Sequence, residues 1–283
     1  MSGENAYHIN LVEENADQDG SDEGALTLMP WCYQNLFTII SIVAVLWVIH
    51  RLVLGTQPKW FAYMMYLYTK YEFVQFEEVK KDHFASLSSV VSHDPELRKK
   101  KEIRILEIGV GTGVNFAHYP EGTHLVGVDR NLHFKSYWEE NRKQFPNIYS
   151  GEMLTTSAEN IEAVADNSVD VVAITLVLCS VPKIDPILKE VLRVLAPGGK
   201  FYFMEHIAEF DPEKHGLRKM MQDVLTYLYV WPFIYDGCCL NRDMLPNIKK
   251  AGFSSVEAEK YYAPVPNIIF DVERPNLKGI ATK

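Results

Sequence analysis

Basic residues are scarce in this sequence compared with acidic ones. The 283-residue chain has 28 Lys and Arg against 37 Asp and Glu, which gives a net charge of −9 at pH 7. The nearest approach to a basic patch is the short run Arg98-Lys99-Lys100-Lys101. A protein that binds nucleic acid needs a clustered basic surface to neutralise phosphates, so this composition argues against a nucleic-acid partner.

Cysteine is also rare. The four cysteines are Cys32, Cys179, Cys238 and Cys239. Adjacent Cys238 and Cys239 cannot readily pair with each other, and free thiols suit a reducing compartment better than a secreted, disulfide-linked domain. No CxxC spacing indicates zinc, so we expect no metal site.

The first thirty residues lack Lys and Arg altogether and contain few large apolar side chains. Their acidic residues are Glu4, Glu13, Glu14, Asp17, Asp19, Asp22 and Glu23. Such a segment has little to bury and much charge to repel, so residues 1–30 are predicted to be a disordered acidic tail. A cleaved signal peptide is not expected, because its first part should be short and basic.

An apolar segment follows the tail. A spanning helix needs about 20 mainly apolar residues, and residues 29–54 supply them. Arg51, Lys59 and Lys70 follow the run and no basic residue precedes it, so the positive-inside rule places the C-terminal side in the cytosol. A buried core helix and a hairpin-like insertion into one leaflet remain alternatives.

A second apolar stretch, Trp60–Tyr68, is too short to span a membrane. It is expected either to lie in the headgroup region or to cover a pocket of the domain that follows. We therefore divide the chain into a tail (1–30), a membrane anchor with an interfacial segment (31–70) and a C-terminal domain (71–283).

Strand and helix patterns alternate from Glu102 onward. Short β-branched runs predict strands at 103–110, 125–130, 168–178 and 199–207, and apolar residues at three- and four-residue steps predict a helix at 185–195. Residues 251–262 and 277–283 are expected to supply the last strands. This alternation predicts an α/β fold, with a parallel sheet covered by helices on both faces.

A glycine-rich turn follows the first of these strands. Gly109, Gly111 and Gly113 allow a tight turn and let a ligand approach the bare backbone. The GxGxG spacing departs from the dinucleotide fingerprint, because Val114 occupies its last glycine position. Asp129 ends the next strand, where a carboxylate can accept hydrogen bonds from a ribose diol.

These motifs together resemble a class I methyltransferase. The stretches that carry the resemblance are LEIGVGTG at 106–113, Asp129, SAEN at 157–160, SVDVV at 168–172 and LRVLAPGGKFYFMEH at 192–206. TLVLCSV at 175–181, DGC at 236–238 and the N-terminal apolar anchor are closest to the membrane-bound methyltransferase-like family, described as alkyl-thiol S-methyltransferases of the endoplasmic reticulum and lipid droplets. The acidic tail departs from that family.

The resemblance implies a Rossmann-like sheet behind an N-terminal membrane anchor, with S-adenosylmethionine as the cofactor. The residues that it places around the cofactor are Glu107, which orders the loop, Gly109, Gly111 and Gly113 at the methionine part, Asp129 at the ribose, Ala158 and Glu159 at the adenine, and Leu176 to Cys179 near the sulfonium. The implied substrate is a small lipophilic thiol, with membrane lipid as the other partner.

Methyl transfer from a sulfonium needs alignment and a dry cavity more than acid–base help. A thiol suits it because a few per cent is thiolate at neutral pH. His206 and Asp236 are candidate catalytic bases, although each can instead be structural. The apolar segment Asp223–Tyr235 is expected to form a lid that faces substrate and membrane, a helix packed on the sheet and broken at Pro232, or both at once.

Two other functions stay open at this point. The same fold serves many acceptors, so O- or C-methylation of a lipid or quinone-like molecule is one alternative. A membrane-anchored scaffold that binds the cofactor without catalysis is the other. The intact glycine turn and Asp129 argue against the scaffold.

Overall fold

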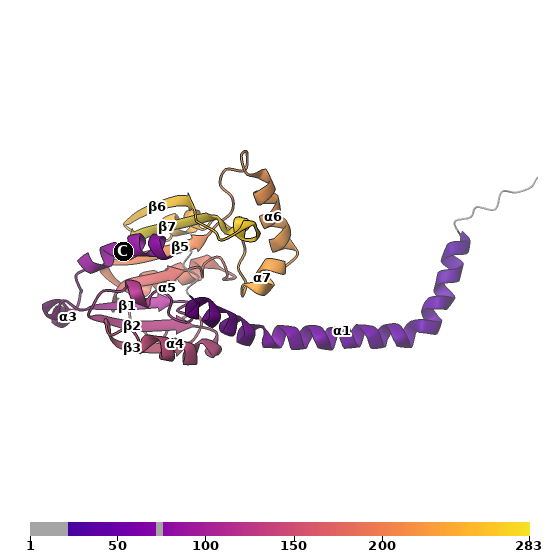
Figure 1. Cartoon of the computed structure of the whole chain (residues 1–283), viewed down its shortest axis with the longest axis horizontal. Coiled ribbons are helices and arrows are strands. Elements are labelled where there is room, and N and C mark those ends of the chain that lie inside the picture. Colours follow the sequence, from indigo (N-terminus) through magenta and orange to yellow (C-terminus); the bar gives the residue numbers. More distant parts are fainter. Residues whose placement is uncertain (1–21, 72–75) are drawn as a thin grey trace, which may run out of the picture. The chain divides into compact units, whose positions relative to one another are not determined.

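The computed structural model describes residues 22–71 and 76–283, and side-chain positions from Trp31 onward except Cys32 and Gln34 (Figure 1). The chain divides into two compact units, Met1–Gly55 and Thr56–Lys283. Helix α1, Asp22–Lys70, runs through the end of the first unit and into the second. The predicted acidic tail therefore lies mostly outside the described residues, and its last part is the start of α1.

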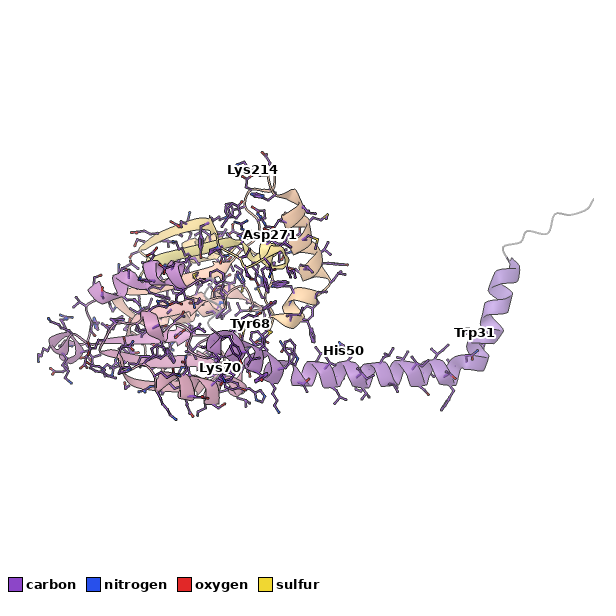
Figure 2. The ribbon with its side chains drawn as sticks, in the orientation of Figure 1. Trp31, His50, Tyr68, Lys70, Lys214 and Asp271 are labelled. Atoms are coloured by element: carbon purple, nitrogen blue, oxygen red, sulfur yellow. The ribbon has the colours of Figure 1, made fainter. Side chains whose placement is uncertain are left out.

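The first unit consists of the N-terminal part of α1. Asn35–Lys70 contains a stretch that is long and apolar enough to cross a membrane by length and composition. In the first unit, side chains project from α1 on more than one side (Figure 2). Phe37, Leu46 and Trp47 are among its exposed apolar residues. A helix that is apolar all round has no polar face to turn toward water.

The second unit is built on a seven-stranded sheet in the order β3-β2-β1-β4-β5-β7-β6 (Figure 1). The strands are β1 (Ile103–Ile108), β2 (Thr123–Asp129), β3 (Ile148–Thr155), β4 (Val169–Thr175), β5 (Leu195–His206), β6 (Ser255–Tyr262) and β7 (Pro275–Thr282). The first five are parallel, and β7 runs antiparallel between β5 and β6. The predicted fold class is confirmed. The sequence did not delimit β3, because this edge strand has exposed residues among its buried ones and no continuous apolar run.

Short helices connect the strands. They are α2 (Glu77–Phe84), α3 (Pro95–Lys100), α4 (Lys135–Arg142), α5 (Ile184–Val194), α6 (Gly216–Tyr227), α7 (Val230–Ile234) and α8 (Leu245–Lys250), with 3-10 turns at Ala85–Ser89, Phe116–His118, Leu132–Phe134 and Ile268–Glu273. Helix α5 matches the predicted helix closely. Its Ile187, Leu188, Val191 and Val194 are buried on one face, as the three- and four-residue spacing requires.

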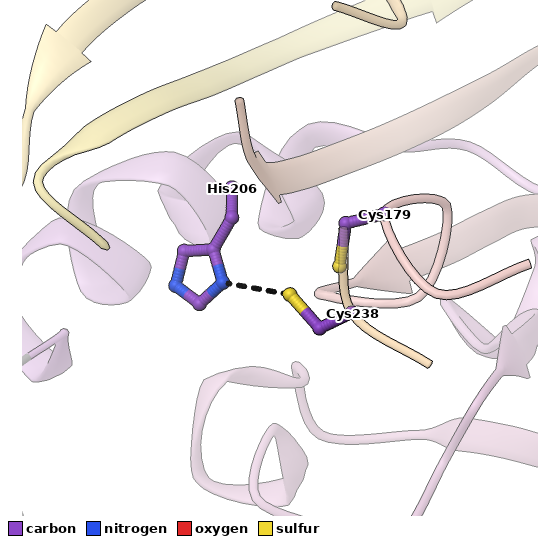
Figure 3. A group of neighbouring side chains, drawn as sticks. All are labelled: Cys179, His206 and Cys238. Atoms are coloured by element: carbon purple, nitrogen blue, oxygen red, sulfur yellow. Dashed lines mark hydrogen bonds between the residues drawn. The ribbon is translucent and has the colours of Figure 1, made fainter. Parts of the chain in front are cut away.

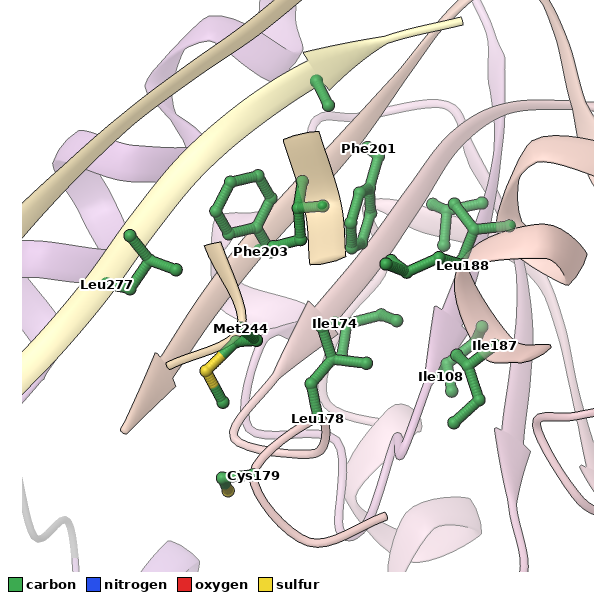
Figure 4. Close-up of a cluster of buried hydrophobic side chains, with 14 of the residues drawn as sticks. Ile108, Ile174, Leu178, Cys179, Ile187, Leu188, Phe201, Phe203, Met244 and Leu277 are labelled. Atoms are coloured by element: carbon green, nitrogen blue, oxygen red, sulfur yellow. The ribbon is translucent and has the colours of Figure 1, made fainter. Parts of the chain in front are cut away.

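Each face of the sheet has its own hydrophobic core. Alternate residues of β5 point to opposite faces, so Phe201 and Phe203 join one core while Tyr202 joins the other. Figure 4 shows the first core, in which Phe203 lies near Leu277 of β7 and Leu188 lies on α5. Burying each such side chain contributes about 1.5–3 kcal/mol. The two cores fix the carboxyl ends of β1, β4 and β5 at one edge, where ligands bind in open α/β sheets.

The C-terminal end of α1 belongs to this second unit. The ring of Trp60 lies 5.8 Å from that of Phe233, and the ring of Phe61 lies 5.9 Å from that of Phe134. The hydroxyls of Thr69 and Thr112 are 2.6 Å apart. The segment Trp60–Tyr68 and the residue after it, Thr69, thus pack against α7, the turn Leu132–Phe134 and the loop after β1.

Candidate functional site

A cavity of about 280 Å³ opens at the carboxyl ends of β1, β2, β4 and β5. The predicted site residues that line it are Gly109, Gly111, Asp129, Ala158, Glu159, Leu176, Cys179, His206 and Asp236. Glu107 and Gly113 do not line it; they support the loop from behind. The structure therefore brings together residues that are more than a hundred positions apart in the chain.

The three glycines of the loop have different reasons to be glycine. All three have positive φ, at 71° for Gly109, 51° for Gly111 and 83° for Gly113. A Cβ atom on Gly109 would lie 2.1 Å from Val177, and one on Gly113 would lie 2.2 Å from the ring of Phe116. A Cβ on Gly111 would meet nothing closer than 4.0 Å. Gly109 and Gly113 thus permit close packing, whereas Gly111 leaves the cavity side of the loop bare.

Asp129 closes the loop from the end of β2. One carboxylate oxygen accepts a 3.0 Å hydrogen bond from the Gly111 amide, and the other accepts one of 2.9 Å from the Asn131 amide. Burial raises the pKa of Asp129 to about 6. An ionised carboxylate has about four lone-pair positions, so it can still accept hydrogen bonds from a ligand.

Glu107 lies below the loop and is almost fully buried. Its carboxylate accepts a 2.7 Å hydrogen bond from the Asn115 side-chain amide, which also donates to the Thr175 hydroxyl at 3.0 Å. Burial raises the pKa of Glu107 to about 7, while burial lowers that of Lys80, which lines the cavity from α2. Sequence reasoning missed Asn115 and Lys80, because neither belongs to a recognisable motif.

Glu205, the next-to-last residue of β5, organises the turn after β4. Its fully buried carboxylate accepts hydrogen bonds from the amides of three consecutive residues, Val177, Leu178 and Cys179, at 3.1, 2.9 and 3.2 Å. Burial raises its pKa to about 7. Leu176, just before this turn, has φ of 58°, a left-handed conformation that costs a branched side chain about 1–2 kcal/mol. Such strain at a cavity wall is typical of a functional site.

Three side chains meet at the other end of the cavity: Cys179 after β4, His206 at the end of β5, and Cys238 after α7 (Figure 3). Their sulfur and ring-nitrogen atoms all lie within 4.8 Å of one another. The Cys238 sulfur is 3.7 Å from Nδ1 of His206. Sequence reasoning had selected Cys179 and His206 but not Cys238.

The three groups perturb one another strongly. The hydrogen bond from Cys179, and then the one from His206, lower the pKa of Cys238 to about 5. The same bond to Cys238, together with burial, raises the pKa of Cys179 well above its usual value. Burial opposes protonation of His206, but Cys238 and the nearby buried carboxyl of Glu273 outweigh it and raise its pKa to about 9.

Asp236 lies at the rim of this end and is held by a neighbour. Its carboxylate is 3.0 Å from the Arg130 guanidinium, which also donates to the Asp236 carbonyl at 3.2 Å. The next residue, Gly237, packs so closely that a Cβ would lie 2.7 Å from the carbonyl oxygen of Ser180. These contacts favour a positioning role for Asp236 over that of a free base.

The apolar segment Asp223–Tyr235 is broken at a different point from the one expected. Helix α6 ends at Tyr227 and α7 begins at Val230, with Tyr229 at φ of 57° between them. Pro232 lies in the first turn of α7, where a missing N–H costs nothing. Only Tyr235 of this segment is among the residues that line the cavity.

Comparison with known proteins decides the family. Residues 106–203 match the family described as "Methyltransferase domain". The human thiol S-methyltransferase TMT1A is 35% identical over 225 residues, which cover 80% of this chain and 86% of the relative. The chain belongs to the thiol S-methyltransferase family. The resemblance inferred from the motifs is confirmed, and this enzyme is an S-adenosylmethionine-dependent methyltransferase.

Other relatives of the methyltransferase agree. The rat thiol S-methyltransferase TMT1B is 34% identical over 225 residues, 79% of this chain and 86% of the relative. Among solved structures, that of the [4+2]-cyclase SpnF has a TM-score of 0.53 at 16% identity, covering 72% of this chain and 79% of the other. That likeness shows the shared fold alone, because one fold hosts many reactions.

Proposed function

We propose that this methyltransferase transfers the methyl group of S-adenosylmethionine to the sulfur of small lipophilic thiols. The observation that carries the proposal is the composition of the cavity: the glycine loop and Asp129 form one end, and Cys179, His206 and Cys238 form the other. Thiol activity in the named relatives supports the same substrate class. The walls between the two ends are mainly apolar, and include Phe61, Met65, Val114, Val181 and Ile187.

The cofactor end fits S-adenosylmethionine. We propose that the loop Gly109–Gly113 receives the methionine part, that Asp129 accepts hydrogen bonds from the ribose, and that Ala158 and Glu159 contact the adenine. The bare backbone at Gly111 and the remaining lone pairs of Asp129 support this assignment. When bound, the cofactor supplies an electrophilic methyl group on a positively charged sulfur.

The protein's own part is to align the acceptor and exclude water. Glu205 holds the turn that carries Leu176 to Cys179, which we propose lies beside the reacting centre. Phe61 and Met65 close the cavity with apolar side chains. A fixed near-attack geometry in a dry cavity accounts for much of the barrier in such a displacement.

We further propose that α1 anchors the enzyme to the endoplasmic reticulum or lipid droplets, with the catalytic unit in the cytosol. The apolar stretch of α1 supports the anchor, and Arg51, Lys59 and Lys70 after it support the orientation. Tyr227, Leu228 and Tyr229 are exposed apolar residues of the second unit that can contact lipid. Deletion of residues 1–54 should release the protein from microsomes; full retention would refute α1 as the anchor.

The decisive experiment compares acceptors. Detergent-solubilised full-length protein is given labelled S-adenosylmethionine with a small alkyl thiol or with the alcohol of the same carbon skeleton. Methylation of the thiol but not the alcohol supports the proposal. Tight cofactor binding without methylation of either would overturn the thiol assignment and favour a lipid or quinone-like acceptor.

A further inference from the structure

We propose that Cys179, His206 and Cys238 form a zinc site whose open fourth position binds the substrate's sulfur. The inference rests on the proposed function, because it explains how a thiol acceptor is held and deprotonated. It departs from the expectation drawn from cysteine spacing, which recognises only ligands that are close together in the chain.

The donor atoms have the separations that zinc needs. Tetrahedral zinc with Zn–S near 2.3 Å and Zn–N near 2.0 Å places sulfur and nitrogen about 3.6 Å apart, and two sulfurs about 3.8 Å apart. Nδ1 of His206 and the Cys238 sulfur are separated by 3.7 Å, and no pair in the group exceeds 4.8 Å. The two ligand atoms that lie farthest apart would have to approach each other by about 1 Å to bind the same ion.

The backbone around the three ligands is already fixed. The amide of Cys179 donates to Glu205 at 3.2 Å, and its carbonyl accepts from the Cys239 amide at 3.0 Å. The Cys238 amide donates to the Tyr235 carbonyl at 3.0 Å. His206 lies in the β5–β7 ladder, opposite Asn276. A ligand set held in this way loses little conformational entropy when the ion binds.

The chemistry of the ligands selects the ion. Two thiolates and one imidazole are a soft to borderline set that suits zinc and does not suit magnesium or calcium. Structural zinc sites have four protein ligands, whereas catalytic sites have three and leave one position open. Cys179, His206 and Cys238 line the same cavity as Gly109 and Asp129, so a fourth ligand can reach the ion from the cavity that we assign to the cofactor.

The ion binds with release of the two cysteine protons, and the acceptor R–SH then loses its proton to solvent as its sulfur takes the fourth position. A lone pair of this sulfur forms the new S–CH₃ bond while the methyl–sulfonium bond of the cofactor breaks. The electrons of the broken bond remain on the cofactor sulfur, which becomes a neutral thioether. The product R–S–CH₃ is also neutral, binds the ion weakly and can leave.

Cobalt(II) substitution tests the site without relying on activity. Full-length protein, purified with a reductant and stripped with a chelator, is titrated with Co²⁺. We expect one equivalent to bind, with a thiolate-to-cobalt charge-transfer band, and Zn²⁺ to displace it. Failure of the reduced wild-type protein to give this band would overturn the site, and that result needs no variant to be folded.

Variants locate the ion. Cys179→Ser, Cys238→Ser and His206→Gln should each weaken binding by more than the roughly 10–100-fold that changes around a metal's ligands cost. Cys239→Ser is the matched control, because its sulfur interacts with the Gly237 carbonyl at 3.5 Å and is not part of the group. Equal loss of the band in Cys239→Ser would place the ion elsewhere.

The substrate's position is tested on the same cobalt protein. An added alkyl thiol should strengthen the charge-transfer band because a third thiolate binds, and the matched alcohol should leave it unchanged. Metal-free protein that methylates thiols at the full rate would overturn the role of the ion while leaving the proposed function intact. A cobalt band that responds to thiols in an enzyme that methylates none would refute the proposed function, and with it the substrate role of the open position, but not the metal site itself.

Discussion

The two ends of the cavity are built in different ways. The cofactor end is formed where three consecutive strands, β1, β2 and β3, end, and the glycine backbone after β1 is held against Asp129. The acceptor end joins Cys179, His206 and Cys238, which come from three separate segments. The first depends on local backbone conformation, whereas the second depends on the packing of the whole sheet. Substitutions at the cofactor end should therefore mainly weaken cofactor binding, whereas those at the acceptor end should mainly lower the stability of the fold.

The largest effect is expected at the acceptor end. Glu205→Ala leaves three amides without an acceptor, two of which are buried. Each buried one costs about 1–3 kcal/mol, so the free energy of unfolding should fall by about 2–6 kcal/mol. Thermal unfolding of the solubilised chain measures this. Glu205→Gln keeps one carbonyl acceptor and should lose less. Equal stability of Glu205→Ala and the parent would show that the turn does not depend on this carboxylate.

Asp129→Ala should instead weaken cofactor binding. Hydrogen bonds to a charged group contribute about 1.5–3 kcal/mol each, so losing two from the ribose predicts an affinity for S-adenosylhomocysteine at least about 100-fold lower. Isothermal titration calorimetry measures it, with Asp129→Asn as the matched variant that should lose less. Unchanged affinity in Asp129→Ala would refute the ribose assignment.

A pair of glycine substitutions separates backbone strain from steric clash. Gly113 and Gly198 have similar positive φ, 83° and 77°, but only at Gly113 does a new Cβ meet a neighbour, the ring of Phe116. Gly198→Ala should cost about 1–2 kcal/mol from conformation alone. Gly113→Ala should cost about 1–3 kcal/mol more, because the ring must move. Urea unfolding compares the two, and equal losses would mean that the loop repacks freely.

The pH dependence of cofactor binding is the next smaller effect. Burial raises the pKa of Asp129 to about 6, so the carboxyl is ionised above that pH and accepts hydrogen bonds poorly below it. Affinity for S-adenosylhomocysteine should be steady above pH 7 and fall up to about tenfold per pH unit below 6. Because folding raises this pKa, the contribution of Asp129 to stability is present at low pH and is lost as pH rises through about 6.

The control for this profile is Asp129→Asn, which has no titrating group at the position. Its affinity should be flat from pH 5 to 7 if Asp129 is the group that titrates. If the affinity of Asp129→Asn falls with pH as steeply as that of the parent, the titrating group is another residue.

The smallest effect is expected at Asp236. Asp236→Asn breaks a partly exposed ion pair with Arg130, and such pairs contribute about 0.2–1 kcal/mol. If Asp236 only holds its loop in place through Arg130, the kcat of Asp236→Asn with a thiol acceptor should change little. A loss of kcat of about 100-fold or more would restore it as the catalytic base.

The same difference between the two ends decides what the sequence can predict. The cofactor loop, Asp129 and most of the strands follow from contiguous patterns. Glu205 and Cys238 act through partners 26 to 32 residues away in the chain, so no local spacing reveals them. Strand β3 was missed because its pattern of burial is mixed, and the break before α7 was misplaced because a proline in a first helical turn does not end a helix.

The single helix α1 has a practical consequence for anyone who wants a water-soluble form of this enzyme. Its apolar N-terminal part is the obvious part to remove, and the sequence alone suggests a cut after Lys70. That cut would also remove Phe61 and Met65, which line the cavity, and Thr69, whose hydroxyl is hydrogen-bonded to that of Thr112. A cut at Gly55 follows the boundary between the two compact units and keeps all three residues in the truncated enzyme.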